Sequence, residues 1–369
     1  MAQILYPRNL RPLLFLLLMF GAGTGIRAQS AAPAKVLCIG SSYTNFNDLP
    51  GLLQGMADNR CGACLEVHER THNGWFLADH AADETTRAVI RSEAWDVVIL
   101  QGSSIHLAYP FYFPEPSVFD ALEELKALIL ENRSQTRIVF FLPWAWEEGL
   151  TFASGRTEDY FRMQDRILSN SLRYASELDL ILAPVGMAWT RILQDPDLPE
   201  HYLHDPDLHH PNLRGSYLAA CVLFSTLTGE STEGSPFPAS LTGEVARSLQ
   251  EAGSNTVREN PEIWRIPEAG PLASENPGTR AYSGADFIVG PNPFRNNVRI
   301  QFRAGAGVLC RLELSTLLGQ TVCVEERTGR GSEWLEVEFA PETRACGGMY
   351  LCTLVRGSHR IARSLVQLK

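Results

Sequence analysis

The sequence predicts an α/β domain built as three layers around a parallel sheet, followed by a small antiparallel β-sandwich. Up to about residue 250, short apolar segments alternate with longer segments of helical periodicity, a pattern typical of βαβ units. The chain then becomes rich in Pro, Gly, Asn, Ser and Glu, and afterwards consists of short alternating apolar segments between turn signals. We therefore expect the α/β domain over residues 29–251, a linker over 252–285 and the sandwich over 286–369.

The composition is that of a globular, acidic protein. The chain has 369 residues, is 45% hydrophobic and carries a formal net charge of −10. The apolar fraction is enough for a full core, and the length favours two domains. The acidic balance argues against nucleic acid as a partner, because a phosphate backbone is bound mainly by clustered basic side chains.

The N-terminus has the pattern of a secretory signal peptide. Arg8 and Arg11 precede an apolar run from Leu13 to Phe20, and small residues then lead to Ala28. The run is too short to span a bilayer comfortably. We expect residues 1–28 to be removed and the mature protein to be exported and soluble.

An apolar strand that opens into a serine-bearing turn organises the α/β domain. Val36–Ile39 predicts a buried strand, and Gly40 allows the sharp exit that such a strand needs. Ser42 then lies at the carboxyl end of the sheet, where open α/β folds place their ligands. Its hydroxyl is a candidate nucleophile; the alternative is a helix N-cap.

A second polar stretch holds a candidate base and carboxylate. Asp207 and His210 precede Pro211, so a single loop conformation positions both side chains. A serine nucleophile needs an imidazole to take its proton and a carboxylate to fix the ring tautomer. A metal site is the alternative, because the stretch is rich in metal-ligand types. The possible ligands are His201, His204, Asp205, Asp207, His209 and His210.

Gly74 follows a second predicted strand, over residues 65–69. A glycine at the carboxyl end of a strand lets its N–H approach a ligand, which is one requirement of an oxyanion hole. The alternative is an ordinary turn glycine.

These segments resemble, in order, the sequence blocks of the SGNH/GDSL hydrolases. Gly-Ser-Ser-Tyr-Thr at 40–44 and Asn-Asp-Leu-Pro at 47–50 resemble the first block of one subgroup. Residues 74–80 match the subgroup's Gly-x-x-Leu-x-x-His, and residues 100–104 match its Leu-Gln-x-x-Ser. Residues 207–211 match the family's Asp-x-x-His-Pro. The likeness implies the family's flavodoxin-like fold.

The resemblance also implies a serine esterase that works through an acyl-enzyme and needs no cofactor or metal. By position in the motifs, Ser42 is the nucleophile, His210 the base and Asp207 the carboxylate that orients the base. The N–H groups of Ser42 and Gly74 and the side-chain amide of Gln101 are the implied oxyanion donors.

Two positions depart from the family pattern. Ser41 replaces the usual Asp or Asn before the nucleophile, and Gln101 stands where the third block usually has Asn. The second departure leaves the third oxyanion donor open between Gln101, Ser103 and Ser104. Both departures also allow a protein of another class, a weakly active or inactive surface carbohydrate-binding protein on the same scaffold.

The substrate is not fixed by the fold, which polysaccharide deacetylases, lipases and thioesterases share. Trp144 and Trp146 follow a predicted strand over 137–142, and tryptophans at such a place can stack on sugar faces. With the predicted export, they favour O-acetyl groups on glycans. Alternatively, the two tryptophans cap the core.

The eight cysteines fall four on each side of the predicted linker. Cys61 and Cys64 have the spacing of a zinc or redox motif, but no second pair lies nearby, which favours a local disulfide or two free thiols. Cys38 in a strand and Cys221 in a helix are predicted to be small buried hydrophobes.

The C-terminal part carries four markers in order: Asn-Pro-Phe at 292–294, Leu-x-Gly-Gln at 317–320, Gly-x-Tyr at 348–350 and a basic, apolar tail. They resemble the C-terminal sorting domain of the type IX secretion system of Bacteroidota. The resemblance implies that the type IX machinery is a partner and that the protein is secreted or held at the cell surface. The alternative is an accessory module, for instance one that binds carbohydrate.

Overall fold

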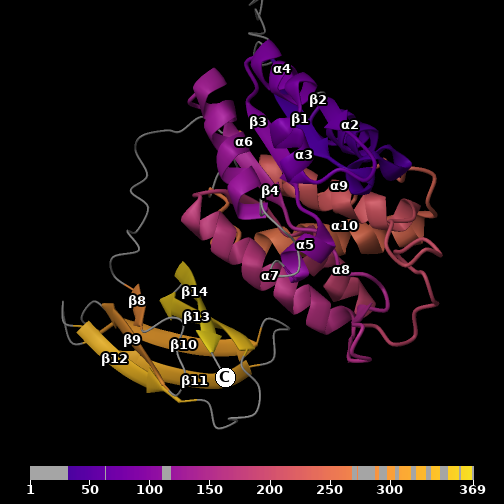
Figure 1. Cartoon of the computed structure of the whole chain (residues 1–369). Helices are drawn as coiled ribbons and strands as arrows, with labels where there is room; N and C mark the ends of the chain where they lie inside the picture. The colour runs from indigo at the N-terminus through magenta and orange to yellow at the C-terminus, as the bar shows by residue number, and fades with distance from the viewer. Residues whose placement is uncertain are drawn as a thin grey trace, which may run out of the picture. The chain divides into compact units, whose positions relative to one another are not determined.

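The computed structural model describes an α/β region and a region of antiparallel strands (Figure 1). The described residues are 32–62, 64–109, 118–267, 272, 287–290, 297–303, 307–316, 321–329, 334–340, 348–356 and 359–367. The predicted signal peptide, much of the predicted linker and the first two sorting markers lie outside these residues.

The α/β region is built on a parallel sheet whose strands follow the order β2-β1-β3-β4-β7. The strands are β1 Ala34–Gly40, β2 Leu65–Thr71, β3 Val97–Gln101, β4 Arg137–Phe141 and β7 Ile181–Ala183. This is the strand order of flavodoxin-like folds, so the predicted three-layer parallel-sheet class is confirmed. The chain leaves β1 toward β2 on one side and resumes with β3 on the other, which makes the carboxyl ends of β1 and β3 the switch point where such folds bind ligands.

Helices cover both faces of the sheet, because right-handed crossovers that run in opposite directions place their helices on opposite sides. On one face α9 packs against α2 and α10, and on the other α3 and α4 pack against α6. The bounds are α2 Leu49–Arg60, α3 Leu77–Ala82, α4 Glu84–Ser92, α6 Val118–Asn132, α7 Tyr160–Glu177, α9 Leu213–Thr228 and α10 Gly243–Arg258. The shorter elements are α1 Ser42–Asn45, η1 Phe46–Asp48, α5 Ser104–Ala108, β5 Leu150–Thr151, β6 Thr157–Glu158 and α8 Val185–Leu193.

The C-terminal boundary of the α/β region differs from the prediction. We expected the linker to begin at residue 252, but α10 runs on to Arg258, and Trp264 and Ile266 are buried in the same core. The Gly, Ser and Asn residues near 253–255 resemble linker composition, yet they lie within a helix whose buried face includes Leu249 and Val257. The region therefore extends to about residue 267.

The C-terminal strands form two antiparallel sheets, β11-β10-β13-β14 and β12-β9-β8. Their bounds are β8 Phe287–Gly290, β9 Val298–Arg303, β10 Leu309–Thr316, β11 Thr321–Thr328, β12 Trp334–Phe339, β13 Gly348–Arg356 and β14 His359–Gln367. Side chains of both sheets share one core, including Phe302 from β9 and Leu354 from β13. The predicted small β-sandwich is confirmed.

Among the residues that the structure describes, no helix combines the length and the apolar character needed to cross a membrane.

Candidate active site

Ser42 is the first residue of α1, directly after β1, and its side chain is largely buried. Its hydroxyl lies 2.8 Å from Nε2 of His210, a residue 168 positions later in the chain. Because Ser42 stands in the first turn of a helix, its backbone N–H has no acceptor within that helix. The turn therefore presents a hydroxyl next to an imidazole, together with a free backbone donor.

The other ring nitrogen of His210 faces a carboxylate. Nδ1 lies 2.5 Å from Oδ2 of Asp207, and the second oxygen, Oδ1, accepts the backbone N–H groups of His209 and His210 at 3.0 and 2.9 Å. Partial burial opposes ionisation of Asp207, but the hydrogen bonds from the ring and from the two backbone groups lower its pKa to about 2. An ionised carboxylate only accepts, so Nδ1 carries the proton and Nε2 is left to accept from Ser42.

The loop that carries this pair is held by Asn212. Its Oδ1 caps α9 by accepting the N–H groups of Arg214 and Gly215, and its Nδ2 donates to the carbonyls of His201 and His204. The N-cap of a long buried helix thus also fixes the loop before it. This arrangement explains how two side chains three residues apart adopt one defined geometry.

The structure places Gly74 beside the same pocket, in a left-handed conformation with φ of +79° that favours glycine. A Cβ at this position would meet no atom within 4 Å, so the backbone conformation rather than crowding requires the glycine. Within the described residues, the Gly74 N–H has no hydrogen-bond acceptor. It is therefore available to a ligand.

Gln101, the predicted amide donor, lies at the end of β3 and is nearly buried. Its Oε1 accepts from the N–H and the hydroxyl of Ser41, at 2.7 and 3.0 Å, and one Nε2 hydrogen donates to the carbonyl of Gly102 at 2.5 Å. Gln101 therefore anchors the turn that carries Ser42 and keeps one amide hydrogen free of these contacts. Of the two alternatives, Ser104 donates its hydroxyl to the Trp144 carbonyl, whereas Ser103 lines the pocket.

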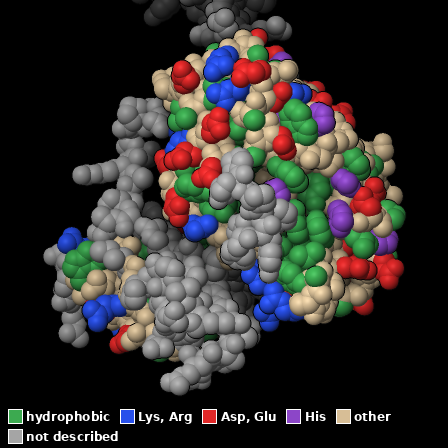
Figure 2. Space-filling view, in the orientation of Figure 1, with side chains coloured by type: hydrophobic (Ala, Val, Ile, Leu, Met, Phe, Trp, Pro, Cys, Tyr) green, Lys and Arg blue, Asp and Glu red, His purple; other side chains and the backbone are tan. Residues whose placement is uncertain are grey.

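These residues surround a pocket of about 220 Å³. Its lining residues are Ser41, Ser42, Tyr43, Gly74, Trp75, Phe76, Gln101, Ser103, Ile105, Trp146, His209 and His210. None of these described lining residues is Lys, Arg, Asp or Glu. Figure 2 shows one face of the α/β region, on which hydrophobic and histidine side chains lie side by side. The pocket suits a neutral ligand with apolar surface.

The two predicted tryptophans have different places. Trp146 lines the pocket, packs against the His209 ring in a tilted arrangement with 4.1 Å between ring centroids, and donates its Nε1–H to the Tyr43 hydroxyl at 3.2 Å. Trp144 is fully buried and lies stacked between Tyr43 and Trp189, with centroid distances of 4.6 and 4.1 Å. Of the two alternatives left open for these tryptophans, a place in the cleft wall fits Trp146 and a place in the core fits Trp144.

His80, the last residue of the Gly-x-x-Leu-x-x-His match, contacts the end of β1. The side chain is fully buried, and its Nε2 lies 3.0 Å from the carbonyl oxygen of Gly40, the residue that ends β1. Burial lowers the pKa of His80, so the ring is neutral and donates its Nε2–H to this carbonyl. The spacing of Leu77 and His80 indicates that the two side chains share the buried face of α3, but it does not indicate which group His80 contacts.

His201 and His204, two histidines of the alternative metal site, have other partners. His201 pairs with the Glu147 carboxylate at 2.6 Å, while the buried His204 points its Nε2 at the Ala145 carbonyl at 3.0 Å. The described part of the chain contains no group of three His, Cys, Asp or Glu side chains placed to hold a metal ion. The two ring nitrogens of His210 instead face Asp207 and Ser42.

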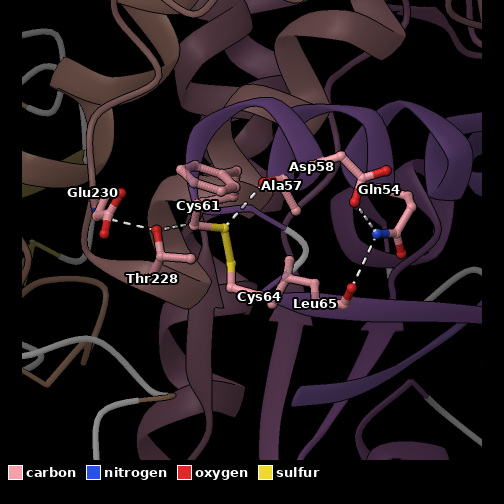
Figure 3. The surroundings of a disulfide bond; sticks show 9 residues. Gln54, Ala57, Asp58, Cys61, Cys64, Leu65, Thr228 and Glu230 are labelled. Carbon is pink, nitrogen blue, oxygen red and sulfur yellow. Dashed lines mark hydrogen bonds between the residues drawn. A yellow bond between two sulfur atoms is a disulfide. The ribbon is translucent and has the colours of Figure 1, made fainter. Parts of the chain in front are cut away.

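Cys61 and Cys64 form a disulfide at the opposite end of the sheet, where α2 ends and β2 begins (Figure 3). Close by, Gln54 connects the same two elements, since its Nε2 donates to the Leu65 carbonyl at 3.0 Å. The local disulfide is one of the two predicted alternatives. Cys38 and Cys221 are buried free thiols, as expected.

No protein-family model matches the chain, and no match is found among curated proteins. Solved structures with a similar fold include a protein from Slackia heliotrinireducens assigned to the SGNH hydrolases, at 23% identity and a TM-score of 0.43 over 53% of this chain and 98% of that one. A DUF4886 family protein from Bacteroides uniformis is similar at 17% identity and a TM-score of 0.47, over 61% of this chain and 95% of that one. An acetylxylan esterase from Geobacillus stearothermophilus is similar at 17% identity and a TM-score of 0.40, over 52% and 93%.

Proposed function

We propose that this protein is an exported serine esterase in which Ser42, His210 and Asp207 act as one catalytic unit. The observation that carries the proposal is the continuous chain of hydrogen bonds, 2.5 and 2.8 Å long, from Asp207 through His210 to Ser42. A carboxylate, an imidazole and a hydroxyl in this order are what acyl transfer through serine requires.

In the acylation step, Ser42 Oγ attacks the ester carbonyl carbon while its proton passes to His210 Nε2. The carbonyl oxygen becomes an oxyanion that accepts hydrogen bonds from the N–H groups of Ser42 and Gly74, with the remaining Nε2 hydrogen of Gln101 as the third donor. The bond to the alcohol oxygen then breaks. His210 returns the proton to that oxygen, and the acyl group stays on Ser42.

Deacylation repeats these roles with water in place of the alcohol. His210 takes a proton from the water as its oxygen attacks the acyl carbon, and Asp207 stabilises the imidazolium that forms. The bond to Ser42 Oγ then breaks, His210 returns the proton to the serine, and the carboxylic acid leaves. No step needs a cofactor.

The pocket favours a neutral ester with a short acyl chain. Its volume of about 220 Å³ is small for a ligand site, and its lining offers aromatic surface from Trp75 and Trp146 without a fixed charge. Such surface suits the ring of a sugar that forms the alcohol part of the ester. We therefore propose O-acetyl groups on glycans as the substrate class.

The proposal is tested by labelling the full mature chain with a fluorophosphonate and mapping the modified residue. We expect modification at Ser42, loss of labelling and of esterase activity in Ser42→Ala and His210→Ala, and no loss in Ser92→Ala, an exposed serine on α4. Full activity in folded Ser42→Ala would end the proposed mechanism. A folded protein that resists labelling but binds acetylated xylan would be the carbohydrate-binding protein instead.

Export is the second part of the proposal. The predicted signal peptide takes the chain across the inner membrane, and the C-terminal sandwich is recognised by the type IX secretion machinery. In a host with that pathway, deletion from residue 347 onward should leave the protein in the periplasm. If the shortened protein still reaches the surface or the medium, the sandwich is an accessory module.

A further inference from the structure

The segment that follows the nucleophile helix contains two successive residues with unusual backbone geometry. Asn47 and Asp48 have φ of +55° and +53°, in the left-handed region that residues other than glycine rarely adopt. Asp48 is the N-cap of α2: its side chain accepts the Gly51 N–H in the first turn of that helix, and this hydrogen bond holds Asp48 in place. The mechanism above gives this segment no role, although the segment connects α1, which carries Ser42, to α2.

The side chain of Asn47 joins the nucleophile turn to the loop that carries the base. Its Nδ2 donates to the carbonyl oxygen of Pro211 at 2.8 Å and to the hydroxyl of Ser216 at 2.9 Å. Pro211 directly follows His210, and Ser216 lies in the first turns of α9. An amide nitrogen has two hydrogens, so both are used in this contact.

Hydrogen bonds run in both directions between residues 46–47 and Ser216. The Ser216 hydroxyl accepts from Asn47 and lies 3.3 Å from the carbonyl oxygen of Phe46, to which it donates its own hydrogen. The Phe46 ring stacks on the His210 imidazole with 4.2 Å between ring centroids. Residues 46 and 47 thus hold the base loop at its backbone and at its imidazole.

We infer that Asn47 is a positioning residue that sets the distance between Ser42 Oγ and His210 Nε2. This inference rests on the proposed function. Ser42 and His210 belong to segments far apart in sequence, and each is fixed within its own segment. The Asn47 amide fixes one segment against the other. Proton transfer depends steeply on such a distance, and a shift of about 1 Å can lower the rate about 100-fold.

The test compares two substitutions that leave the backbone conformation accessible. Asn47→Gly keeps the left-handed geometry and removes the amide, whereas Asn47→Asp keeps the size and replaces the donor by oxygens that repel the Pro211 carbonyl. We expect kcat to fall about 10- to 100-fold in both, KM to change less than about threefold, and the rate of fluorophosphonate labelling to fall with kcat. Asn45→Ala, an exposed residue of the same turn, is the matched control and should stay within about twofold of wild type.

The outcomes separate this inference from the proposed function. If Ser42→Ala is inactive but folded Asn47→Gly or Asn47→Asp has wild-type kcat and labelling rate, Asn47 does not position the unit and the esterase mechanism stands. A loss that appears only in KM, or only as a lower melting temperature with kcat per folded molecule unchanged, also contradicts a positioning role. If Ser42→Ala is fully active, the mechanism itself fails.

Discussion

Replacement of Asp207 by Asn tests the electrostatics of the proposed catalytic unit with the least change in shape. The amide oxygen can still accept the N–H groups of His209 and His210, so the loop keeps its two backbone hydrogen bonds. The amide nitrogen then faces His210 Nδ1. A donor at this place favours the other neutral tautomer of the ring, in which Nδ1 accepts and Nε2 carries the proton. In that tautomer Nε2 can no longer take the proton of Ser42.

The size of the effect follows from the exposure of the carboxylate. Two unit charges about 4 Å apart interact by about 1 kcal/mol in bulk water and by about 4 kcal/mol near a protein surface. The Asp207 side chain is 47% exposed, which screens its interaction with the imidazolium and places it between these limits. That range corresponds to about a fivefold to a thousandfold change in rate, and the wrong tautomer adds to it. We expect kcat to fall about 100- to 1,000-fold, less than in Ser42→Ala.

The assay is steady-state hydrolysis of a soluble acetyl ester near pH 7.5, with the labelling rate of Ser42 measured in parallel. Asp205→Asn is the matched control, since Asp205 lies on the same loop and the substitution removes the same charge; kcat should stay within about threefold of wild type. If Asp207→Asn loses less than threefold while its fold is intact, Asp207 does not orient the base. If Asp205→Asn loses as much as Asp207→Asn, the effect belongs to the charge of the loop rather than to the hydrogen bond.

Three further predictions concern stability and titration. Burial lowers the pKa of His80, so below about pH 6.5 the unfolded chain binds a proton at this ring that the folded protein does not bind. In urea denaturation the free energy of unfolding should therefore decrease as the pH is lowered from 8 to 5, and it should decrease less in His80→Gln. The Glu147 carboxylate raises the pKa of His201, so NMR titration should show that pKa falling in Glu147→Gln. Replacement of Cys61 and Cys64 by Ser should lower stability by at most about 2 kcal/mol for so short a loop and leave kcat unchanged, because the disulfide lies at the amino end of β2. A change in kcat there would mean that the two ends of the sheet are coupled.

The fold could be read from the sequence because burial in a parallel sheet leaves a strong pattern. Val36–Ile39 and Val97–Leu100 are continuous apolar runs, and both are fully buried strands whose ends meet at the switch point. Ser42 lies at this edge of the sheet because α1 begins just after β1, whereas His210 lies in the loop between α8 and α9, and its role beside Ser42 was expected from the order of the sequence motifs. These features depend on local pattern and topology, which a single sequence displays.

The remaining features depend on packing between distant segments. Trp144 and Trp146 stand two residues apart in one loop, and only the positions of Tyr43 and Trp189 decide that the first is buried and the second lines the pocket. His80 likewise is buried because the end of β1 presents a carbonyl that needs a donor. No periodicity in the sequence encodes these partners.

Ser41 and Gln101, the two residues that depart from the SGNH/GDSL motifs that the sequence resembles, lie in direct contact. Gln101 Oε1 accepts from the Ser41 N–H at 2.7 Å and from the Ser41 hydroxyl at 3.0 Å, so a side chain before Ser42 that can donate suits this glutamine. A serine hydroxyl does so, as an Asn amide would, whereas an Asp carboxylate would place two acceptors against each other. A Cβ on Gly40 would come within 2.7 Å of the same Oε1, so the glycine that ends β1 leaves room for the longer glutamine. The turn that carries Ser42 is therefore held by hydrogen bonds that connect Ser41, Gln101 and Gly102.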